Sequence, residues 1–207
     1  MNKGALWGSL WFPDQETTPV CHALLQDPRF FALLLQSDQE LAARTKAGGC
    51  TCLGRLDRSN YPRKPRGCLA EFRAIFDHRF SFCCATCRKR ATPESVRFLG
   101  RRVYLALVVV LSSSRHAGSN SATPTLAGLA VPARTLEHWR GWWRDTFKQT
   151  GLWLSTCGAF MPPLDTEALP DALLERFLGS DAATRMSGLL RFLTPLTLQA
   201  PRLQPSP

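Results

Sequence analysis

The chain lacks a long apolar run and a recognisable secretory signal. Its longest apolar run, Tyr104–Leu111, has eight residues, whereas a membrane-spanning helix needs roughly 20. Near the start, Pro13 and Asp14 interrupt the apolar residues too early for a signal peptide. We therefore expect no membrane-spanning helix and a cytoplasmic protein whose thiols stay reduced, which disfavours a disulfide framework.

The chain also lacks the motifs of common enzyme classes. It has no phosphate-binding glycine loop, no nucleophile elbow and no His-Glu pattern of a zinc protease. Its acidic residues fall mostly on the surfaces of expected helices, and no strand-borne aspartate precedes a partner that would help hold two divalent ions for a nuclease. We therefore expect the protein not to be an enzyme.

Acidic residues are scarce in one block of the sequence. Residues 44–102 carry 15 lysines and arginines against 4 acidic residues, whereas the rest of the chain carries 11 against 12. The net charge of +10 therefore resides in this block. A localised basic block is typical of a protein that binds a polyanion, most often nucleic acid. The alternative is a solvated surface that only keeps the protein soluble.

Six of the eight cysteines lie in the same basic block. Cys50 and Cys52 form one pair, and Cys84 and Cys87 form a C-x-x-C pair after 31 intervening residues. Two such pairs can close a tetrahedral zinc site, since zinc favours sulfur ligands. The segment between the pairs has two prolines and few large aliphatic residues, so metal binding would supply much of its folding free energy.

Other assignments of these cysteines remain open at this point. Cys83, Cys68 or His78 could replace one of the four proposed ligands, because the first pair has only one intervening residue. The cysteines could also be buried thiols that act as small apolar side chains.

The expected fold is mainly α-helical with a small β zinc ribbon, and its helices form a bundle that includes a helix-turn-helix-like hairpin. The expected parts are an N-terminal helical segment (1–47), a basic zinc ribbon (48–92), a helical domain (93–197) and a disordered tail (198–207).

Local signals predict three helices around the ribbon. A helix begins at Pro28, and a capping box from Ser37 to Glu40 predicts a second helix that ends before Gly48. After the ribbon, Thr92 and Pro93 are expected to start a long helix with a buried end. Apolar residues at helical spacing would face inward, and Arg97 would face the solvent.

Residues 124–148 have the order of a helix-turn-helix. Leu126 and Leu129 would lie on its first helix, and Arg134 and Arg140 would lie on its second helix, which enters the major groove of DNA. The alternative is an ordinary helical hairpin whose tryptophans fill a core.

Duplex DNA is the expected partner, and its phosphates would contact two basic strings. The aromatic residues interleaved with these strings leave RNA as an alternative, and a protein-interaction module is another. The DNA-contacting residues are expected to be Arg63, Lys64, Arg66, Arg88, Lys89, Arg90, Arg101, Arg102, Arg134 and Arg140.

Four stretches carry a resemblance to a known family: "CTCLGRLDRSNYPRKPRG", "FRAIFDHRFSFCCATCRKRATPESVRFLGRRVYLALVVVL", "RTLEHWRGWWRDTF" and "LLRFLTPLT". Together they resemble bacterial transposase-like proteins that have the zinc ribbon and helix-turn-helix of insertion-sequence transposases but lack the nuclease domain. The resemblance covers about residues 28–197. It implies that Cys50, Cys52, Cys84 and Cys87 bind zinc and that the basic strings face DNA. A role in transposition, with a transposase or a second copy of the chain as partner, is the corresponding expectation.

Overall fold

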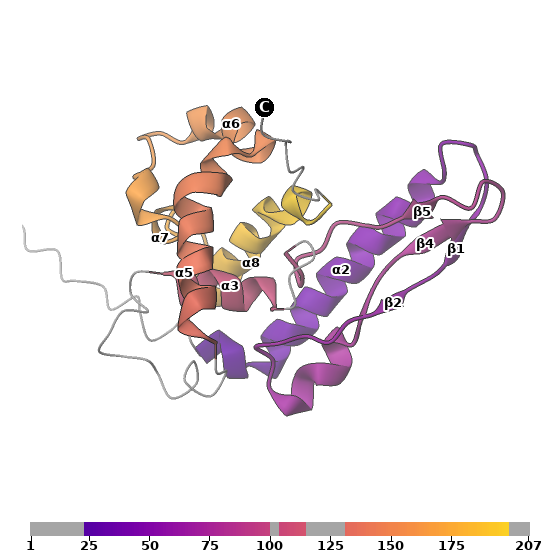
Figure 1. Ribbon diagram of the computed structural model, residues 1–207, viewed down its shortest axis with the longest axis horizontal. Coiled ribbons are helices and arrows are strands. Elements are labelled where there is room, and N and C mark those ends of the chain that lie inside the picture. Colours follow the sequence, from indigo (N-terminus) through magenta and orange to yellow (C-terminus); the bar gives the residue numbers. More distant parts are fainter. Residues whose placement is uncertain (1–22, 100–103, 115–130, 199–207) are drawn as a thin grey trace, which may run out of the picture.

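The computed structural model describes residues 23–99, 104–114 and 131–198. These residues form a helical body and an arm that projects from it (Figure 1). We define the arm as the last turns of helix α2 (Pro28–Gly48) together with the strands that lie beside it. The other helices, all in the body, are α3 (Ala106–Ser113), α5 (Ala133–Gly141), α6 (Gly151–Thr156), α7 (Asp171–Leu174) and α8 (Ala182–Phe192).

Helix α2 is one continuous helix, so the prediction of two separate helices is wrong. The Asp27 side chain caps it by accepting a hydrogen bond from the Arg29 N–H at 2.9 Å, and Pro28 occupies its first turn. The helix ends at Gly48 and is capped by Gly49, whose φ of 69° favours glycine. The expected capping residue Ser37 instead lies buried within the helix, where its hydroxyl accepts from Arg191 at 3.1 Å.

The body is built around α3, which is the buried helix that the apolar run predicts. All eight of its residues are buried, and α5 and α8 pack against it. Trp139 of α5 meets Tyr104 edge to face at a centroid distance of 5.0 Å. A neighbouring aromatic group around the buried Phe31 and Phe76 joins the start of α2 to the 3₁₀ helix Ala70–Phe76.

The long helix predicted from Thr92 does not form. Residues 92–99 are not helical, and the helix begins only at Ala106. The reason is tertiary, because the amide N–H of Val96 donates to the Asp38 carboxylate at 2.7 Å and that of Ser95 donates to the Thr197 hydroxyl at 3.2 Å. Arg97 is accordingly buried, with 1% of its surface exposed, and does not face the solvent.

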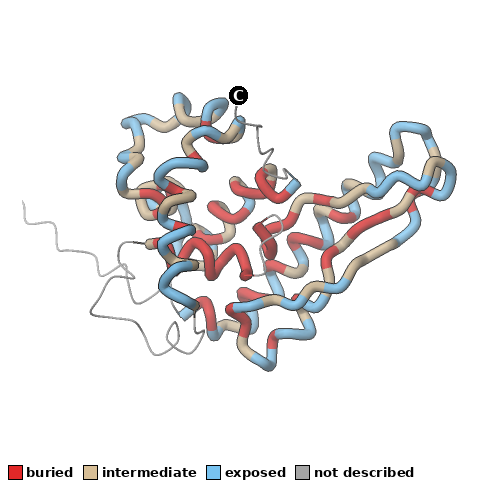
Figure 2. Tube along the Cα trace, in the orientation of Figure 1, coloured by how far each residue is buried: buried red, intermediate tan, exposed pale blue. Residues whose placement is uncertain are grey.

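The arm contains the small antiparallel sheet that the sequence predicts. Strands β1 (Leu56–Arg58), β4 (Phe82–Cys84) and β5 (Arg90–Ala91) pair in the order β1-β4-β5, while β2 (Tyr61–Pro62) and β3 (His78–Arg79) form a separate ribbon. Few residues of the arm are buried, as the short red stretches of Figure 2 show. The buried apolar residues there are Ala42, Leu56, Phe82 and Cys84.

Helix α5 lies where the second helix of the predicted helix-turn-helix was expected. Its Trp139 is buried and its Leu136 is half-buried, and both pack against the core of the body. The helix expected before it includes Leu126 and Leu129, which lie outside the described residues. The helix-turn-helix therefore stays a prediction. Among the described ranges, no helix has both the length and the apolar character needed to cross a membrane.

Candidate metal centre

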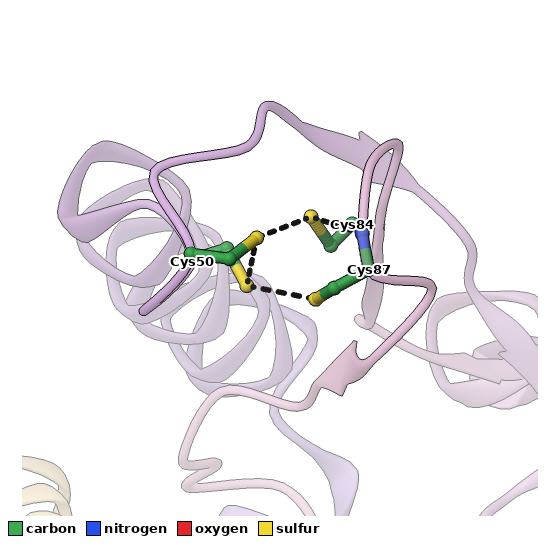
Figure 3. A group of neighbouring side chains, drawn as sticks. Cys50, Cys84 and Cys87 are labelled. Carbon is green, nitrogen blue, oxygen red and sulfur yellow. Dashed lines mark hydrogen bonds between the residues drawn. The ribbon is translucent and has the colours of Figure 1, made fainter.

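Two turns at the tip of the arm position the four cysteines (Figure 3). The first turn follows the glycine end of α2, and the Leu53 N–H closes it onto the Cys50 carbonyl at 2.8 Å. The second turn follows β4, and the Arg88 N–H closes it onto the Cys84 carbonyl at 3.1 Å. Leu53 and Arg88 have φ values of 62° and 61°, which non-glycine residues rarely adopt. The two turns thus hold the thiol groups toward one another.

The four sulfur atoms form one compact group. The Sγ of Cys52 lies 3.5 Å from those of Cys50 and Cys84, and the Sγ atoms of Cys50 and Cys87 are 3.4 Å apart. All four atoms lie within 4.8 Å of one another. A tetrahedral zinc with bonds of about 2.3 Å would place its sulfur ligands about 3.8 Å apart. The predicted ligand set is therefore compact enough to hold a single metal ion.

Backbone N–H groups favour ionisation of two of these thiols. The Cys87 N–H donates to the Cys84 Sγ at 3.4 Å and lowers the pKa of Cys84 to about 6. The Cys52 N–H lowers the pKa of Cys50 in the same way. Although the Lys89 N–H favours the Cys87 thiolate, the neighbouring thiols Cys52 and Cys50 raise the pKa of Cys87 to about 12. A divalent cation would remove this conflict, since it stabilises all four thiolates together.

The structure separates the proposed ligands from the three residues that could have replaced them. The Cys83 Sγ lies 3.5 Å from the Arg88 carbonyl oxygen and is not part of the four-sulfur group. Cys68 is buried in the core of the body, where burial raises the pKa of its thiol to about 11. His78 contacts Asp77 and packs against Phe80.

Gly54 lies so close to the cysteines that a larger residue would disturb them. A Cβ at this position would lie 2.6 Å from the Cys84 Sγ and from the Thr86 hydroxyl. We therefore expect Gly54→Ala to weaken zinc binding by about tenfold or more, measured by competition with a chromophoric chelator. Gly48→Ala is the matched control, because a Cβ there has nothing within 4 Å. Equal zinc affinity in the two variants would contradict this placement.

The predicted DNA-contacting residues of the arm divide into two groups. Arg88 and Lys89 are exposed in the second turn, directly after Cys87. The other group directly follows strand β2. In this group Lys64 and Arg66 are exposed, and Arg63 is half-buried, with its guanidinium 5.1 Å from the Phe98 ring centroid.

Arg90 lies in β5 and connects the sheet with the ribbon. Its Nη1 donates to the Ser59 carbonyl and the Ser81 hydroxyl, each at 2.9 Å. Its guanidinium lies 5.7 Å from the Tyr61 ring centroid. Arg90 is therefore exposed but held in place.

The remaining predicted DNA-contacting residues are not on the arm. Arg134 and Arg140 are exposed on α5, which lies in the body away from the tip of the arm (Figure 1). Arg101 and Arg102 lie outside the described residues. Among the described residues, Arg134 and Arg140 are therefore separate from the predicted DNA-contacting residues of the arm.

Sequence reasoning missed a buried ionic network at the base of the arm. The Arg97 Nε donates to Asp38 at 2.7 Å, and both side chains are almost fully buried. Arg97 also donates to the carbonyl oxygens of Ile75 and His78 and lies over the rings of three phenylalanines. The available signal was Asp38, three residues after the end of the apolar run 30–35, but the capping-box interpretation obscured it.

The arm thus combines a four-sulfur cluster of metal-site dimensions with a set of exposed cationic side chains. Among the described residues, this is the one group of cysteine, histidine and acidic side chains close enough to hold a metal ion. No protein-family model matches the chain, and neither a curated protein nor a solved structure matches it.

Proposed function

We propose that the protein is a zinc-stabilised nucleic-acid-binding protein that contacts duplex DNA through its arm. The observation that carries the proposal is the position of Arg88 and Lys89, which directly follow the last cysteine of the four-sulfur cluster. A metal that fixes Cys84 and Cys87 also fixes the turn that presents these two cations. Zinc has a structural role in this proposal, since four protein sulfurs leave no open coordination position.

The charge of the arm supports a polyanionic partner. The nearby carboxylates are few and already engaged, because Asp57 pairs with Arg55 at 2.9 Å and Asp77 contacts His78. Several exposed cations therefore remain available to release counterions from a nucleic-acid backbone on binding. These exposed residues are Arg44, Lys46, Arg58, Lys64, Arg66, Arg88, Lys89 and Arg90.

The tip of the arm also needs the stabilisation that a metal provides. Its apolar cluster has four buried members with four partly buried residues packed against them, and Leu53 is 96% exposed. A segment with so little apolar burial cannot offset the conformational entropy lost on folding. The coordination of a structural zinc by four thiolates releases about 10 kcal/mol or more, which can offset it.

The resemblance to insertion-sequence transposases gives this activity a context. In the proposed role, the chain recognises DNA without cleaving it and works beside a transposase or a second copy of itself. Arg134 and Arg140 on α5 would then form a second, separate DNA contact from the body.

A salt titration with duplex DNA tests the proposed function. We expect binding of the zinc-loaded protein to weaken steeply between about 50 and 200 mM salt, and Arg88→Ala to lower the slope of log K against log salt by about 1. Arg29→Ala, which removes an exposed arginine at the other end of α2, should leave the slope unchanged. Equal affinity and slope for Arg88→Ala and wild type would contradict the proposal.

Single-stranded RNA is the second candidate ligand, because half-exposed aromatic rings lie among the cations of the arm. Tyr61 and Phe80 are both half-buried, and bases of single strands stack on such rings. Direct competition between a DNA duplex and a single-stranded RNA of equal length distinguishes the two. Preferential displacement of the duplex by RNA would favour the second candidate.

A further inference from the structure

Arg79 on β3 is a buried cation whose hydrogen bonding is incomplete. Only 2% of the residue is exposed, and its Nη2 donates to the Pro93 carbonyl at 2.9 Å. Its Nη1 is buried and has no hydrogen-bond partner among the described residues. Burial of a charge without complete pairing is costly, so this atom requires an explanation other than fold stability.

The surroundings of Arg79 hold more positive than negative charge. Burial is the main cause that lowers the pKa of Arg79, Tyr61 and Asp38 act against it, and the cations Arg63 and Arg97 lower the pKa further. Asp38 is already engaged, since it accepts hydrogen bonds from Ser95, Val96 and Arg97. No carboxylate in the described part of the chain forms an ion pair with Arg79. The positive charge of Arg79 is therefore not neutralised by a carboxylate and would attract an anion bound nearby.

Three side chains near Arg79 are suited to an oxyanion, of which Arg90 is exposed and Tyr61 and Arg63 are half-buried. Tyr61 pairs with Arg79 across the β2–β3 ribbon, and the Arg63 N–H continues the ladder by donating to the Asp77 carbonyl at 2.6 Å. Because alternate residues of a strand share one face, Tyr61 and Arg63 lie on the same side of the ribbon. Arg90 reaches the Tyr61 ring from the neighbouring strand β5.

We infer that Tyr61, Arg63 and Arg90, backed by the buried Arg79, form a subsite for a phosphate group of the nucleic-acid backbone. This inference rests on the proposed function and deepens it, because it assigns one phosphate to the ribbon and not to the cysteine-bearing turn. The Tyr61 hydroxyl and the guanidinium groups of Arg63 and Arg90 donate hydrogen bonds to the phosphate oxygens. Arg79 adds its field from a region of low dielectric, where a charge acts more strongly than in water.

The subsite also gives the metal a direct influence on phosphate binding. Arg90 belongs to β5, which pairs with β4, and β4 ends at the proposed ligand Cys84. Loss of the metal would therefore release Arg90 from Tyr61, and the ribbon arginine Arg63 would be affected less.

Duplex-DNA binding by single variants of the zinc-loaded protein tests the inference. We expect Arg63→Gln and Arg90→Gln each to weaken binding about tenfold and to lower the salt slope by about 1. Tyr61→Phe should weaken binding by a smaller factor at an unchanged slope, since it removes a neutral donor. The control Arg29→Gln removes an equal charge from an exposed position at the body end of α2 and should bind like the wild type.

Two outcomes separate the subsite from the proposed function. If Arg88→Ala weakens binding while Arg63→Gln and Arg90→Gln bind like the wild type, the subsite is wrong and the proposed function stands. If the wild type binds no duplex, both are wrong. The variant Arg79→Met tests the role of the buried cation. We expect it to bind DNA more weakly while its midpoint of thermal unfolding stays unchanged. A lower midpoint with unchanged DNA binding would show that Arg79 serves only the fold.

Discussion

Replacing Cys84 and Cys87 by serine is expected to abolish metal binding and to unfold the tip of the arm, residues 49–55 and 84–89. Both cysteines belong to the four-sulfur cluster, and a site with two thiolates left cannot hold zinc tightly. The tip then loses about 10 kcal/mol or more of binding free energy. The four-membered apolar cluster beside it is too small to replace that contribution.

Hydrogen exchange measured by mass spectrometry would show this local effect. Peptides from the tip should exchange within the shortest labelling time in the double variant, while peptides from α3 and α8, which belong to the large core, keep their protection. Cys83→Ser is the matched control, because Cys83 lies in the same strand but outside the sulfur cluster. Retained protection of the tip in the double variant would show that the arm does not depend on a metal.

Replacing Asp38 by alanine is expected to lower the free energy of unfolding by about 3–5 kcal/mol. The change leaves the Arg97 guanidinium buried without its carboxylate, and both side chains are almost fully excluded from water. It also removes the acceptor of the Ser95 hydroxyl and the Val96 N–H, which holds residues 95–97 against α2.

Urea denaturation compares this variant with a matched control on the same helix. Glu40→Ala removes an exposed carboxylate that lies 4.0 Å from Arg191, so its effect should stay below about 1 kcal/mol. The m-value should stay the same in both variants, since the surface exposed on unfolding does not change much. An effect of Asp38→Ala as small as that of Glu40→Ala would contradict the role assigned to the buried pair.

Chemically specific signals in the sequence were sufficient to find the candidate metal site. Two cysteine pairs at ligand-like spacing have few alternative arrangements, and the structure brings the same four sulfurs together. The small antiparallel sheet and the buried helix α3 were predicted for a similar reason, since a zinc ribbon implies a short sheet and a continuous apolar run favours a buried helix. These features are determined mostly by residues close to one another in the sequence.

The features that sequence reasoning missed depend on distant contacts. Residues 92–99 have a helix-start signal and helical apolar spacing, but Asp38 and Thr197 bind their backbone N–H groups and side chains from far along the chain. The capping box at Ser37 was overridden because no glycine or proline interrupts α2 from Arg29 to Ala47. Arg79 has no sequence signal, because only the fold shows that it is buried beside other arginines.

Metal analysis of the purified wild type beside the Cys84→Ser/Cys87→Ser variant tests the central claim most directly. The account predicts about one zinc ion per wild-type chain and almost none in the variant. A cobalt-substituted wild type should also show the absorption of a tetrahedral site with four thiolate ligands. A wild type that is folded throughout the arm and holds no metal, even after incubation with zinc, would contradict the account.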